Sequence, residues 1–440
     1  MNHALRNIFI CLLFLLAGAR IAIGEAESPE AEALPLNELR TFTEIFAKIK
    51  SDYVEQVNDK ELLENAIRGM LEGLDPHSAY LDEDSYKDLQ EGTSGEFGGL
   101  GIEVGMENGF VKVISPIDDT PAQKAGIKAG DLIIKLDDRS VKGMSLNDAV
   151  DIMRGKPGDP ITLTIIRESE EKPLVITVVR DIIKTKSVRF ETLEPGFGYL
   201  RISSFQSHTV EGLRQAIDQL KEDNSGKLKG IVLDLRNNPG GILTAAVGVS
   251  DMFLNKGMIV YTEGRKKDSK LKFNAKPNAK LPDVPLIVLV NAGSASASEI
   301  VAGALQDHGR GIIMGEKTFG KGSVQTILPM NNNAALKLTT ARYYTPNGRS
   351  IQASGITPDI IIDKVKISKI EEAFGTSVKE ADLIGHLDNG QEEAPVTEGD
   401  EELKKDISEE ETVPLSSRDY ELYEALNVLK GLAIIKKETR

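Results

Sequence analysis

Three serines at alternate positions stand in the stretch NAGSASASEI, directly after the apolar run LIVLV. An apolar strand that leads into small residues and then into a helix can present a serine hydroxyl beside unpaired backbone N–H groups. Such a serine could attack a carbonyl carbon while the N–H groups stabilise the oxyanion. A structural role is the alternative, because Ser296 and Glu299 also fit an S-x-x-E capping box. Both roles can coexist, since an N-cap serine lies among free N–H donors.

A nucleophilic serine needs a general base, and the chain has few histidines for that role. His308 closes the helix predicted after Ser296 and is better explained as its C-terminal cap, beside the helix dipole. The chain therefore offers few histidines that could serve in a Ser-His-Asp triad. No histidine has a zinc-site spacing such as HExxH. The one cysteine, Cys11, lies in the N-terminal segment, so thiolate chemistry is excluded from the rest of the chain.

Lysine is the other candidate base. Lys321 stands between two glycines, 25 residues after Ser296 and ahead of a short apolar strand. A lysine acts as a general base only when burial lowers its pKa towards neutrality, so Lys321 would have to be partly buried. Gln325 follows four positions later and would share a face with Lys321 in an extended segment, where its amide could orient the amine without adding charge. A solvated loop lysine is the alternative.

A glycine pair follows another predicted strand, in the stretch GIVLDLRNNPGGILTAA. Gly240 and Gly241 would allow a backbone N–H to approach a substrate oxygen there, and the helix that follows would add positive potential. An ordinary turn between a strand and a helix explains the two glycines equally well.

The elements that must position these residues can be predicted from apolar periodicity. Strands and helices alternate from residue 196 to about 362, which predicts an α/β layer structure with a largely parallel sheet. Residues 95–182 have the pattern of short strands with one amphipathic helix at 145–155. Residues 36–89 and 417–436 have the spacing of helices. We predict a multidomain α+β protein with an α/β core, a β-rich inserted domain and helical elements near both ends.

The composition of the terminal segments and the overall charge restrict the cellular setting and the partners. Residues 1–24 combine Arg6, an apolar run and small residues before an acidic stretch, which is the pattern of a secretory signal peptide cleaved after Gly24. An uncleaved anchor is the alternative. Residues 387–413 form an acidic, low-complexity stretch that predicts a linker. The net charge of −15 argues against nucleic acid as a partner.

Several of these stretches together resemble one family. The motifs DLRNNPGG, NAGSASASEI, GEKTFGKGSVQT and TARYYTPNGRSIQ follow the order found in the carboxyl-terminal processing peptidases. The similarity runs from about Leu36 to Asp363 and includes LDPHSAYL at 74–81. It implies that Ser296 is the nucleophile and Lys321 its general base. It also implies that Gln325 supports the lysine.

The same resemblance implies where the oxyanion is held and how the core is built. It places the oxyanion donors at the N–H groups of Ala297 and of a glycine in NPGG, best matched by Gly241. It leaves Ser294 and Ser298 to shape the turn around the nucleophile. The protease core is expected to be of the ClpP and crotonase kind.

The β-rich unit is similar to the PDZ domain inserted in these proteases. Its stretch GGLGIEV at 98–104 matches the loop that grips a terminal carboxylate with N–H groups, and the strand after it would pair with the peptide. Its apolar side chains would favour an apolar last residue in the peptide. Arg154 stands at a position that couples peptide binding to activation in relatives. The expected peptide-binding residues are Gly99, Leu100, Gly101 and Ile102.

The patterns and the resemblance together predict a secreted serine endopeptidase that binds C-terminal tails through its PDZ domain and cleaves by a Ser-Lys dyad. We expect it to need no cofactor or metal and to act on unfolded or C-terminally exposed proteins in the periplasm of a bacterial envelope, free or peripherally bound to a membrane. An activating adaptor and a homodimer or larger assembly are expected partners. The predicted segments are a signal peptide (1–24), an N-terminal helical region (25–94), a PDZ domain (95–182), a serine protease core (183–365), an acidic linker (366–413) and a C-terminal helix (414–440).

Two other functions fit parts of the pattern. A PDZ adaptor with an inactive protease core would use the same β-rich unit, and an acyl-thioester enzyme of the crotonase kind would use the same glycine N–H donors. The acidic stretch at 387–413 acts either as a tether or as an occupant of a neighbour's PDZ groove.

Overall fold

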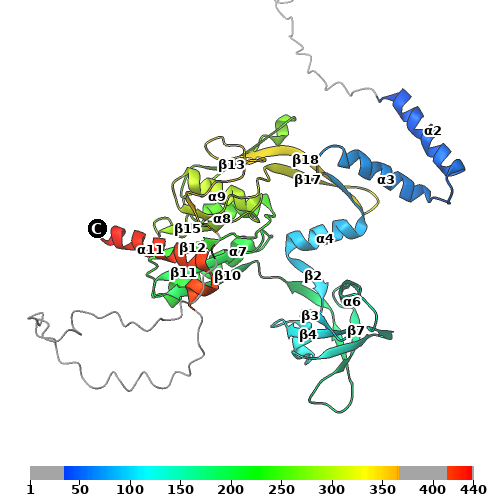
Figure 1. Cartoon of the computed structure of the whole chain (residues 1–440), viewed down its shortest axis with the longest axis horizontal. Helices are drawn as coiled ribbons and strands as arrows, with labels where there is room; N and C mark the ends of the chain where they lie inside the picture. The colour runs from blue at the N-terminus through cyan, green and yellow to red at the C-terminus, as the bar shows by residue number, and fades with distance from the viewer. Residues whose placement is uncertain (1–33, 364, 366–413, 439–440) are drawn as a thin grey trace, which may run out of the picture. The chain divides into compact units, whose positions relative to one another are not determined.

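The computed structural model describes residues 34–363, 365 and 414–438. The predicted signal peptide and acidic linker lie outside the described residues. The chain divides into two units, Met1–Met70 and Leu71–Arg440. Helix α2 (Leu36–Asp52) lies in the first unit (Figure 1). It has the predicted amphipathic pattern and buries none of its residues. Among the described residues, no helix has the length and apolar content needed to cross a membrane.

The segment after α2 confirms the predicted helices, with one short strand between them. The turn DPHS follows α3. The N-cap of α4 is Asp82, whose side chain accepts a hydrogen bond from the N–H of Ser85. The elements of this segment are α3 (Asp59–Glu72), β1 (Ala79–Leu81) and α4 (Glu83–Ser94).

The β-rich unit is an antiparallel sheet in the order β3-β4-β5-β7-β8, with β6 added to β5. Its apolar side chains form a separate core that includes Val113, Ile133 and Leu163. A Ser145 capping box begins the predicted amphipathic helix α6, whose buried residues face this core. The elements are β3 (Ile102–Glu107), β4 (Phe110–Pro116), α5 (Pro121–Lys124), β5 (Leu132–Leu136), β6 (Arg139–Ser140), α6 (Leu146–Met153), β7 (Pro160–Ile166) and β8 (Leu174–Val179).

A two-stranded ribbon connects this unit to the rest of the chain on both sides. Strand β2 (Glu96–Gly99) precedes the unit, strand β9 (Asp181–Lys184) follows it, and the two pair antiparallel. Thr185 continues the pairing by donating its N–H to the carbonyl of Gly95. The unit is therefore inserted in the chain between two hydrogen-bonded strands.

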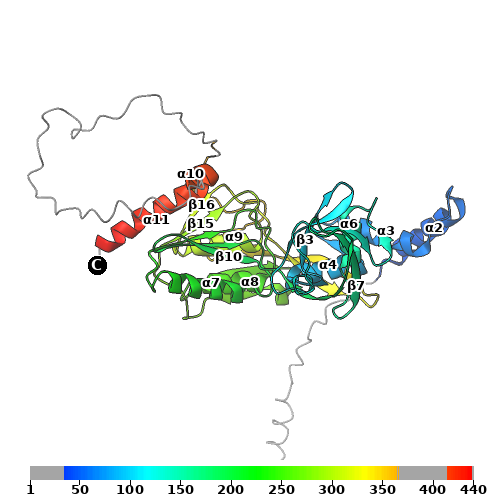
Figure 2. The same ribbon diagram turned by 90° about the horizontal axis from the view of Figure 1, so that it is seen from below.

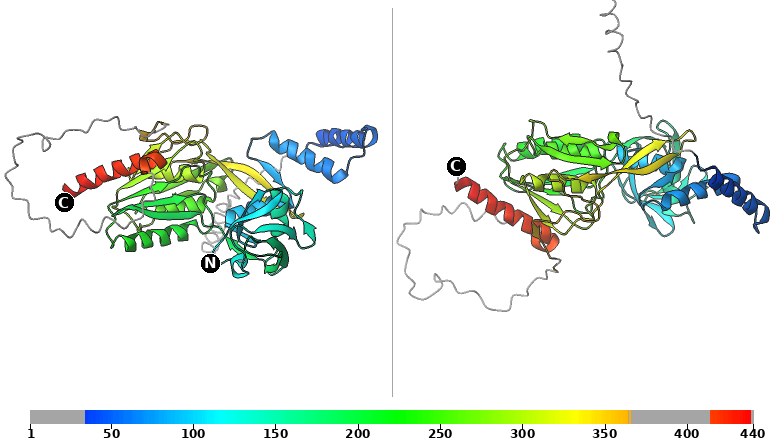
Figure 3. Two further views of the ribbon diagram at one scale, coloured as in Figure 1. Left: turned by 60° about the horizontal axis from the view of Figure 1, so that its bottom comes forward. Right: turned by 90° about the horizontal axis from the view of Figure 1, so that it is seen from above.

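The α/β core contains the sheet β10-β11-β12-β15-β16-β19, which is parallel except for β10. Ile231 and Leu233 of β12 belong to an apolar cluster with helices α7, α8 and α9, whereas Val232 belongs to a cluster with α11. Figures 2 and 3 show α11 on one face of the sheet and α7 and α8 on the other. Coverage on both faces explains the uninterrupted apolar runs of its strands.

The elements of this core begin with the hairpin of β10 and β11 and end with α11, which lies beyond the undescribed segment. They are β10 (Val188–Glu194), β11 (Phe197–Ile202), α7 (Thr209–Asp223), β12 (Gly230–Asp234), α8 (Leu243–Asp251), β15 (Leu286–Val290), α9 (Ala297–Asp307), β16 (Ile312–Gly315), β19 (Ile360–Ile361), α10 (Leu415–Arg418) and α11 (Tyr420–Glu438).

A second, antiparallel sheet was not predicted. The alternation of strands and helices placed residues 335–344 among the parallel strands, but they form β18, which pairs antiparallel with β1, β13 and β17. Only a short turn joins β17 to β18, and such a turn permits a hairpin but no parallel crossover. The remaining elements are β13 (Met258–Gly264), a 3₁₀ turn (Lys267–Ser269), β14 (Lys272–Asn274), β17 (Ser323–Pro329) and β18 (Ala335–Tyr344).

Candidate active site

Ser296 stands between the end of β15 and the first turn of α9, in a backbone conformation that is unfavourable for serine. Its φ is 55° and its ψ is −109°, and the residue is 7% exposed. A non-glycine residue in such a conformation costs about 1–3 kcal/mol, so the surrounding contacts must hold it there. A strained serine between a buried strand and a helix presents its hydroxyl away from both elements, as a nucleophile requires.

Hydrogen bonds from the neighbouring serines hold this turn. Ser294 Oγ donates to the carbonyl of Leu235 at 2.8 Å, and Ser298 Oγ donates to the carbonyl of Asn238 at 2.9 Å. Both side chains are fully buried. They connect the serine turn to the loop after β12, in agreement with the turn-shaping role expected for them.

Glu299 connects the segment of Ser296 to the segment of Lys321. This fully buried carboxylate accepts the N–H of Ser296 at 2.7 Å, as the capping box predicts. It also accepts the hydroxyl of Thr318 at 2.6 Å and the N–H groups of Gly320 at 2.7 Å and Lys321 at 2.9 Å. The capping signal identified Glu299, but no pattern in the sequence indicated its contacts beyond the helix.

Two backbone N–H groups near Ser296 are free to bind an oxyanion. Within the part of the chain that the structure describes, neither Gly241 nor Ala297 donates its N–H to any acceptor. Gly240 lies beside them: a Cβ atom there would lie 2.8 Å from Ser296 Cβ and 3.0 Å from the nitrogen of Ala297. The N–H of Gly240 is already bonded to Asn238 Oδ1. Of these three groups, only the N–H of Gly241 and of Ala297 are therefore left to bind another acceptor.

Lys321 has the burial expected of a general base. Burial lowers the pKa of its amine, and the positive charge of Lys337 lowers it further, whereas the nearby charge of Asp75 acts in the opposite direction. Among the described residues, Ser296 Oγ and Lys321 Nζ share no hydrogen bond. Burial also raises the pKa of Tyr343 to about 12, and the hydroxyl of Ser296 interacts with its phenol. The structure thus joins the two segments through Glu299, whose carboxylate accepts the N–H groups of both Ser296 and Lys321.

Gln325 does not reach Lys321 in the way the sequence argument assumed. Lys321 precedes β17, and a bulge between Val324 and Gln325 interrupts the alternation of faces. The Gln325 amide donates to Ser323 Oγ at 2.9 Å and to Thr339 Oγ1 at 3.4 Å. Gln325 is therefore connected to the surroundings of the lysine through other side chains.

Asp75 links Gln325 to the electrostatic surroundings of Lys321. This role of Asp75 could not be predicted from the sequence. Thr339 Oγ1 donates to Asp75 Oδ1 at 3.0 Å, so Thr339 lies between Gln325 and the carboxylate that acts on Lys321. Burial raises the pKa of Asp75, but hydrogen bonds from Ser78, His77 and Thr339 outweigh it and lower the pKa overall. The only signal was the motif LDPHSAYL, which carried the family resemblance without a role for its residues.

The histidine alternative gains no support. His308 is the C-cap of α9, as predicted, and its Nε2 lies 2.7 Å from the carbonyl oxygen of Met258, to which it must donate. That contact occupies a ring nitrogen that a triad would need. Within the described residues, no cluster of three or more histidine, cysteine, aspartate or glutamate side chains is arranged to hold a metal ion.

Comparison with known proteins decides the family. Residues 196–362 match the family model "Peptidase family S41", residues 98–178 match "PDZ domain", and residues 18–85 match "Activating protease CtpB N-terminal domain". A carboxy-terminal-processing protease of Bartonella bacilliformis is 48% identical over 96% of this chain and 95% of that protein. The chain belongs to the carboxy-terminal processing serine proteases of family S41.

Two further processing proteases show lower similarity to this chain. Carboxy-terminal processing protease CtpA of Bacillus subtilis is 39% identical over 72% of this chain and 67% of that protein. Among solved structures, the photosystem II D1 C-terminal processing protease is 33% identical, over 73% of this chain and 86% of that one, with a TM-score of 0.44. The protein is thus a mixed α/β member of S41 with an N-terminal helical domain, a PDZ domain and a peptidase core.

The PDZ domain of this S41 protease has an open edge beside the predicted carboxylate loop. Strand β3 pairs with β4 on one side only, so its other edge can accept an extended peptide. Within the described chain, the N–H groups of Leu100 and Gly101 have no acceptor. Gly101 has a φ of 78°, and a Cβ there would lie 2.3 Å from Thr120 Cβ, so the tight loop needs glycine.

The side chains of the four predicted peptide-binding residues differ in exposure. Leu100 is 2% exposed and belongs to the PDZ core, with Ile102 packed against the same cluster. They can form the floor of an apolar site, whereas Gly99 and Gly101 contribute backbone only. Arg154 lies outside this loop, with its guanidinium 5.2 Å from the centroid of the Phe97 ring.

Proposed function

We propose that this S41 protease is exported, binds the C-terminal tails of unfolded or C-terminally exposed proteins through its PDZ domain, and cleaves upstream of the tail with Ser296 as nucleophile and Lys321 as base. The observation that carries the proposal is the pair of unpaired N–H groups, on Gly241 and Ala297, beside a strained and buried serine. Two further observations support it. Lys321 is half-buried and has a lowered pKa, and its backbone N–H binds the same carboxylate, Glu299, as the backbone N–H of Ser296.

The proposed reaction begins with proton transfer from Ser296 to the neutral amine of Lys321 as Oγ attacks the scissile carbonyl carbon. The N–H groups of Gly241 and Ala297 stabilise the oxyanion of the tetrahedral intermediate. The lysine ammonium then returns the proton to the leaving amine, and an acyl-enzyme remains. Water attacks this ester with Lys321 as base and releases the shortened protein.

Two further residues support the base in this proposal. Lys321 Nζ must approach Ser296 Oγ during the reaction, because the resting serine interacts with Tyr343 instead. Gln325, linked through Thr339 to Asp75, is expected to orient the amine in that state. An open cleft of about 390 Å³ has Thr339, Arg342 and Tyr344 in its wall and would receive substrate next to this network.

The remaining parts of the proposal concern architecture, location and assembly. We propose a core of the ClpP and crotonase kind, a periplasmic location reached through the signal peptide, and an active state that involves an adaptor and a second copy of the chain. The parallel sheet followed by glycine N–H donors supports the core assignment. The adaptor and acyl-thioester functions lose support because the related chains are named as proteases.

The test is cleavage of an unfolded model protein with an apolar C-terminus between pH 6 and pH 10. The wild-type chain is expected to cleave, with a rate that rises as Lys321 loses its proton. Ser296→Ala and Lys321→Ala are both expected to abolish cleavage while circular dichroism shows an intact fold. Retention of cleavage in either variant would overturn the Ser-Lys assignment.

A further inference from the structure

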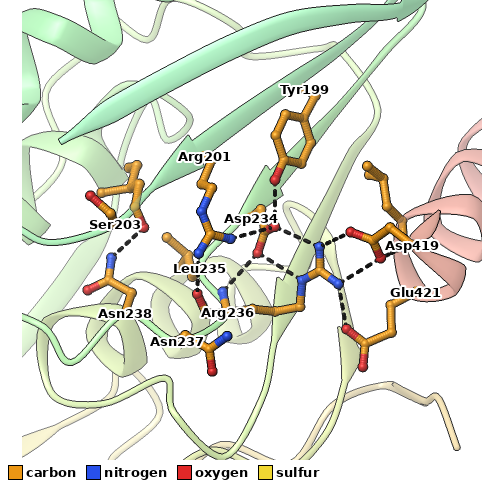
Figure 4. A network of polar contacts seen from close by, with 12 residues as sticks. Tyr199, Arg201, Ser203, Asp234, Leu235, Arg236, Asn237, Asn238, Asp419 and Glu421 are labelled. Carbon is orange, nitrogen blue, oxygen red and sulfur yellow. Dashed lines mark hydrogen bonds and ion pairs between the residues drawn. The ribbon is translucent and has the colours of Figure 1, made fainter. Parts of the chain in front are cut away.

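The loop that carries the oxyanion glycine begins with an arginine whose charge is neutralised by the C-terminal helices. Arg236 follows β12, and its side chain is 12% exposed. Its Nη1 and Nη2 donate to the two carboxylate oxygens of Asp419 at 2.9 and 2.7 Å, and Nη1 also donates to Glu421 at 2.6 Å. Figure 4 shows both acids reaching the guanidinium from the helical segment. Asp419 and Glu421 lie just before and within the first turn of α11.

The core alone cannot neutralise this arginine. Arg236 also bonds to Asp234, which is fully buried, but Asp234 is shared with Arg201 at 3.0 Å and with the hydroxyl of Tyr199 at 2.7 Å. Without the helix, two guanidinium groups would share one buried carboxylate. An ion pair that loses a partner leaves an uncompensated charge, so the Arg236 side chain would turn towards solvent. That movement would disturb the network of Asp234 and Arg201, to which the Arg236 N–H and carbonyl are also bonded.

The backbone after Arg236 leads directly to the catalytic turn. Asn237 has a φ of 55°, and the buried Asn238 accepts the N–H of Ala295 at its carbonyl and the N–H of Gly240 at Oδ1. The loop from residue 236 to Gly241 is therefore held at Arg236 by the ion pairs together with the backbone bonds to Asp234 and Arg201, and farther along by the serine turn. A shift at the ion-paired end changes the direction of the Gly241 N–H.

The rest of α11 is attached to the core without Arg236. Leu426 and Leu429 pack against the sheet in a cluster with Val232 and Leu289. Farther along, Lys430 donates to Glu194 of β10. Because apolar contacts alone could hold the helix, the two acids on a largely buried arginine point to a function other than attachment.

We propose that Asp419 and Glu421 are positioning residues for catalysis, which hold Arg236 and thereby aim the Gly241 N–H at the oxyanion. This inference rests on the proposed function of Ser296, Lys321 and Gly241. It makes the first turn of the C-terminal helix a remote part of the oxyanion hole. Substrate binding in the PDZ domain does not involve these acids, so their effect falls on the chemical step.

The experiment compares the full chain with Asp419→Asn combined with Glu421→Gln, with Asp419→Glu, and with the matched control Lys430→Gln. The double variant is expected to lower kcat by about 10- to 100-fold with KM unchanged, because misaligned donors lose part of the two to three orders of magnitude that one oxyanion donor supplies. Asp419→Glu, which keeps the carboxylate, is expected to retain most of the wild-type kcat. Lys430→Gln removes an ion pair of the same helix and is expected to leave kcat unchanged.

Hydrogen exchange of the amides at 235–242 provides a readout that does not depend on activity. Exchange should be faster in the double variant and unchanged in Lys430→Gln. Unchanged kcat and exchange in the double variant, or an equal loss in Lys430→Gln, would overturn the inference. If the double variant does not fold, Asp419→Asn alone with rescue by Asp419→Glu decides the matter. If the Ser296→Ala variant cleaved at the wild-type rate, that result would instead contradict the proposed function.

Discussion

Replacement of Glu299 by glutamine tests whether this residue sets the spacing of the nucleophile and the base. Oε1 accepts Thr318 and Gly320, and Oε2 accepts Ser296 and Lys321, so the new amide NH₂ must face one of these pairs. Facing Ser296 and Lys321 would leave two buried N–H groups unpaired. Facing the other pair is cheaper, because only the Gly320 N–H loses its acceptor outright.

The magnitude follows from these contacts. One unpaired buried N–H costs about 1–3 kcal/mol, and the surviving bonds lose the strength that a charged acceptor gives them. We expect Glu299→Gln to lower the free energy of unfolding by about 2–4 kcal/mol. The Gly320 N–H would then face the amide NH₂, so the segment of Gly320 and Lys321 would move away from residue 299 and from Ser296. A displacement of the lysine by about 1 Å would reduce kcat about 100-fold.

The assay is kcat and KM on the unfolded model protein, together with thermal unfolding. Thr318→Val is the control, because it removes one hydroxyl from the same carboxylate and leaves the Ser296 and Lys321 contacts in place. It should destabilise the fold with little change in kcat. If Glu299→Gln loses stability but keeps its kcat, Glu299 holds the fold only and the spacing argument is refuted.

Charge and backbone predictions can be tested separately. Lys337→Gln removes a positive charge that lowers the pKa of Lys321, so the rising limb of kcat/KM should move to higher pH. Asp75→Asn removes a negative charge that raises the pKa of Lys321, so the rising limb should move to lower pH. If the pH–rate profiles of both variants shifted in the same direction, the assignment of the limb to Lys321 would be contradicted. Gly101→Ala should abolish binding of a fluorescent peptide with an apolar C-terminus. Gly109→Ala, which has a similar φ but open space around it, should still bind in the same anisotropy titration.

The local features of the site could be predicted from the sequence because they depend on neighbours in the chain. The spacing of Ser296 and Glu299 indicates a capping box, and the N–H of Ser296 does bond to Glu299. The glycines at 240 and 241 follow a predicted strand, and the structure leaves the N–H of Gly241 unpaired. Alternating strands and helices likewise indicate the parallel sheet.

The long-range features could not be predicted in this way. Thr339 and Asp75 are 264 residues apart and meet only because β1 pairs with β18. The bulge at Gln325 changes the side-chain direction without a change in the apolar pattern. The periodicity of α11 indicates a helix, but it gives no sign that Asp419 binds an arginine 183 positions earlier.

The docking of α11 on the parallel sheet determines when, during synthesis of the chain, one face of that sheet can be covered. The last strand of that sheet ends at Ile361, whereas α11 begins at Tyr420, so a ribosome must add a further stretch of chain before the second face is covered. Until then Val232 and Leu289 have no apolar cover from the helix. A nascent chain that stops short of Tyr420 therefore exposes the apolar face of a sheet whose strands are already complete, and only the emergence of α11 can cover that face.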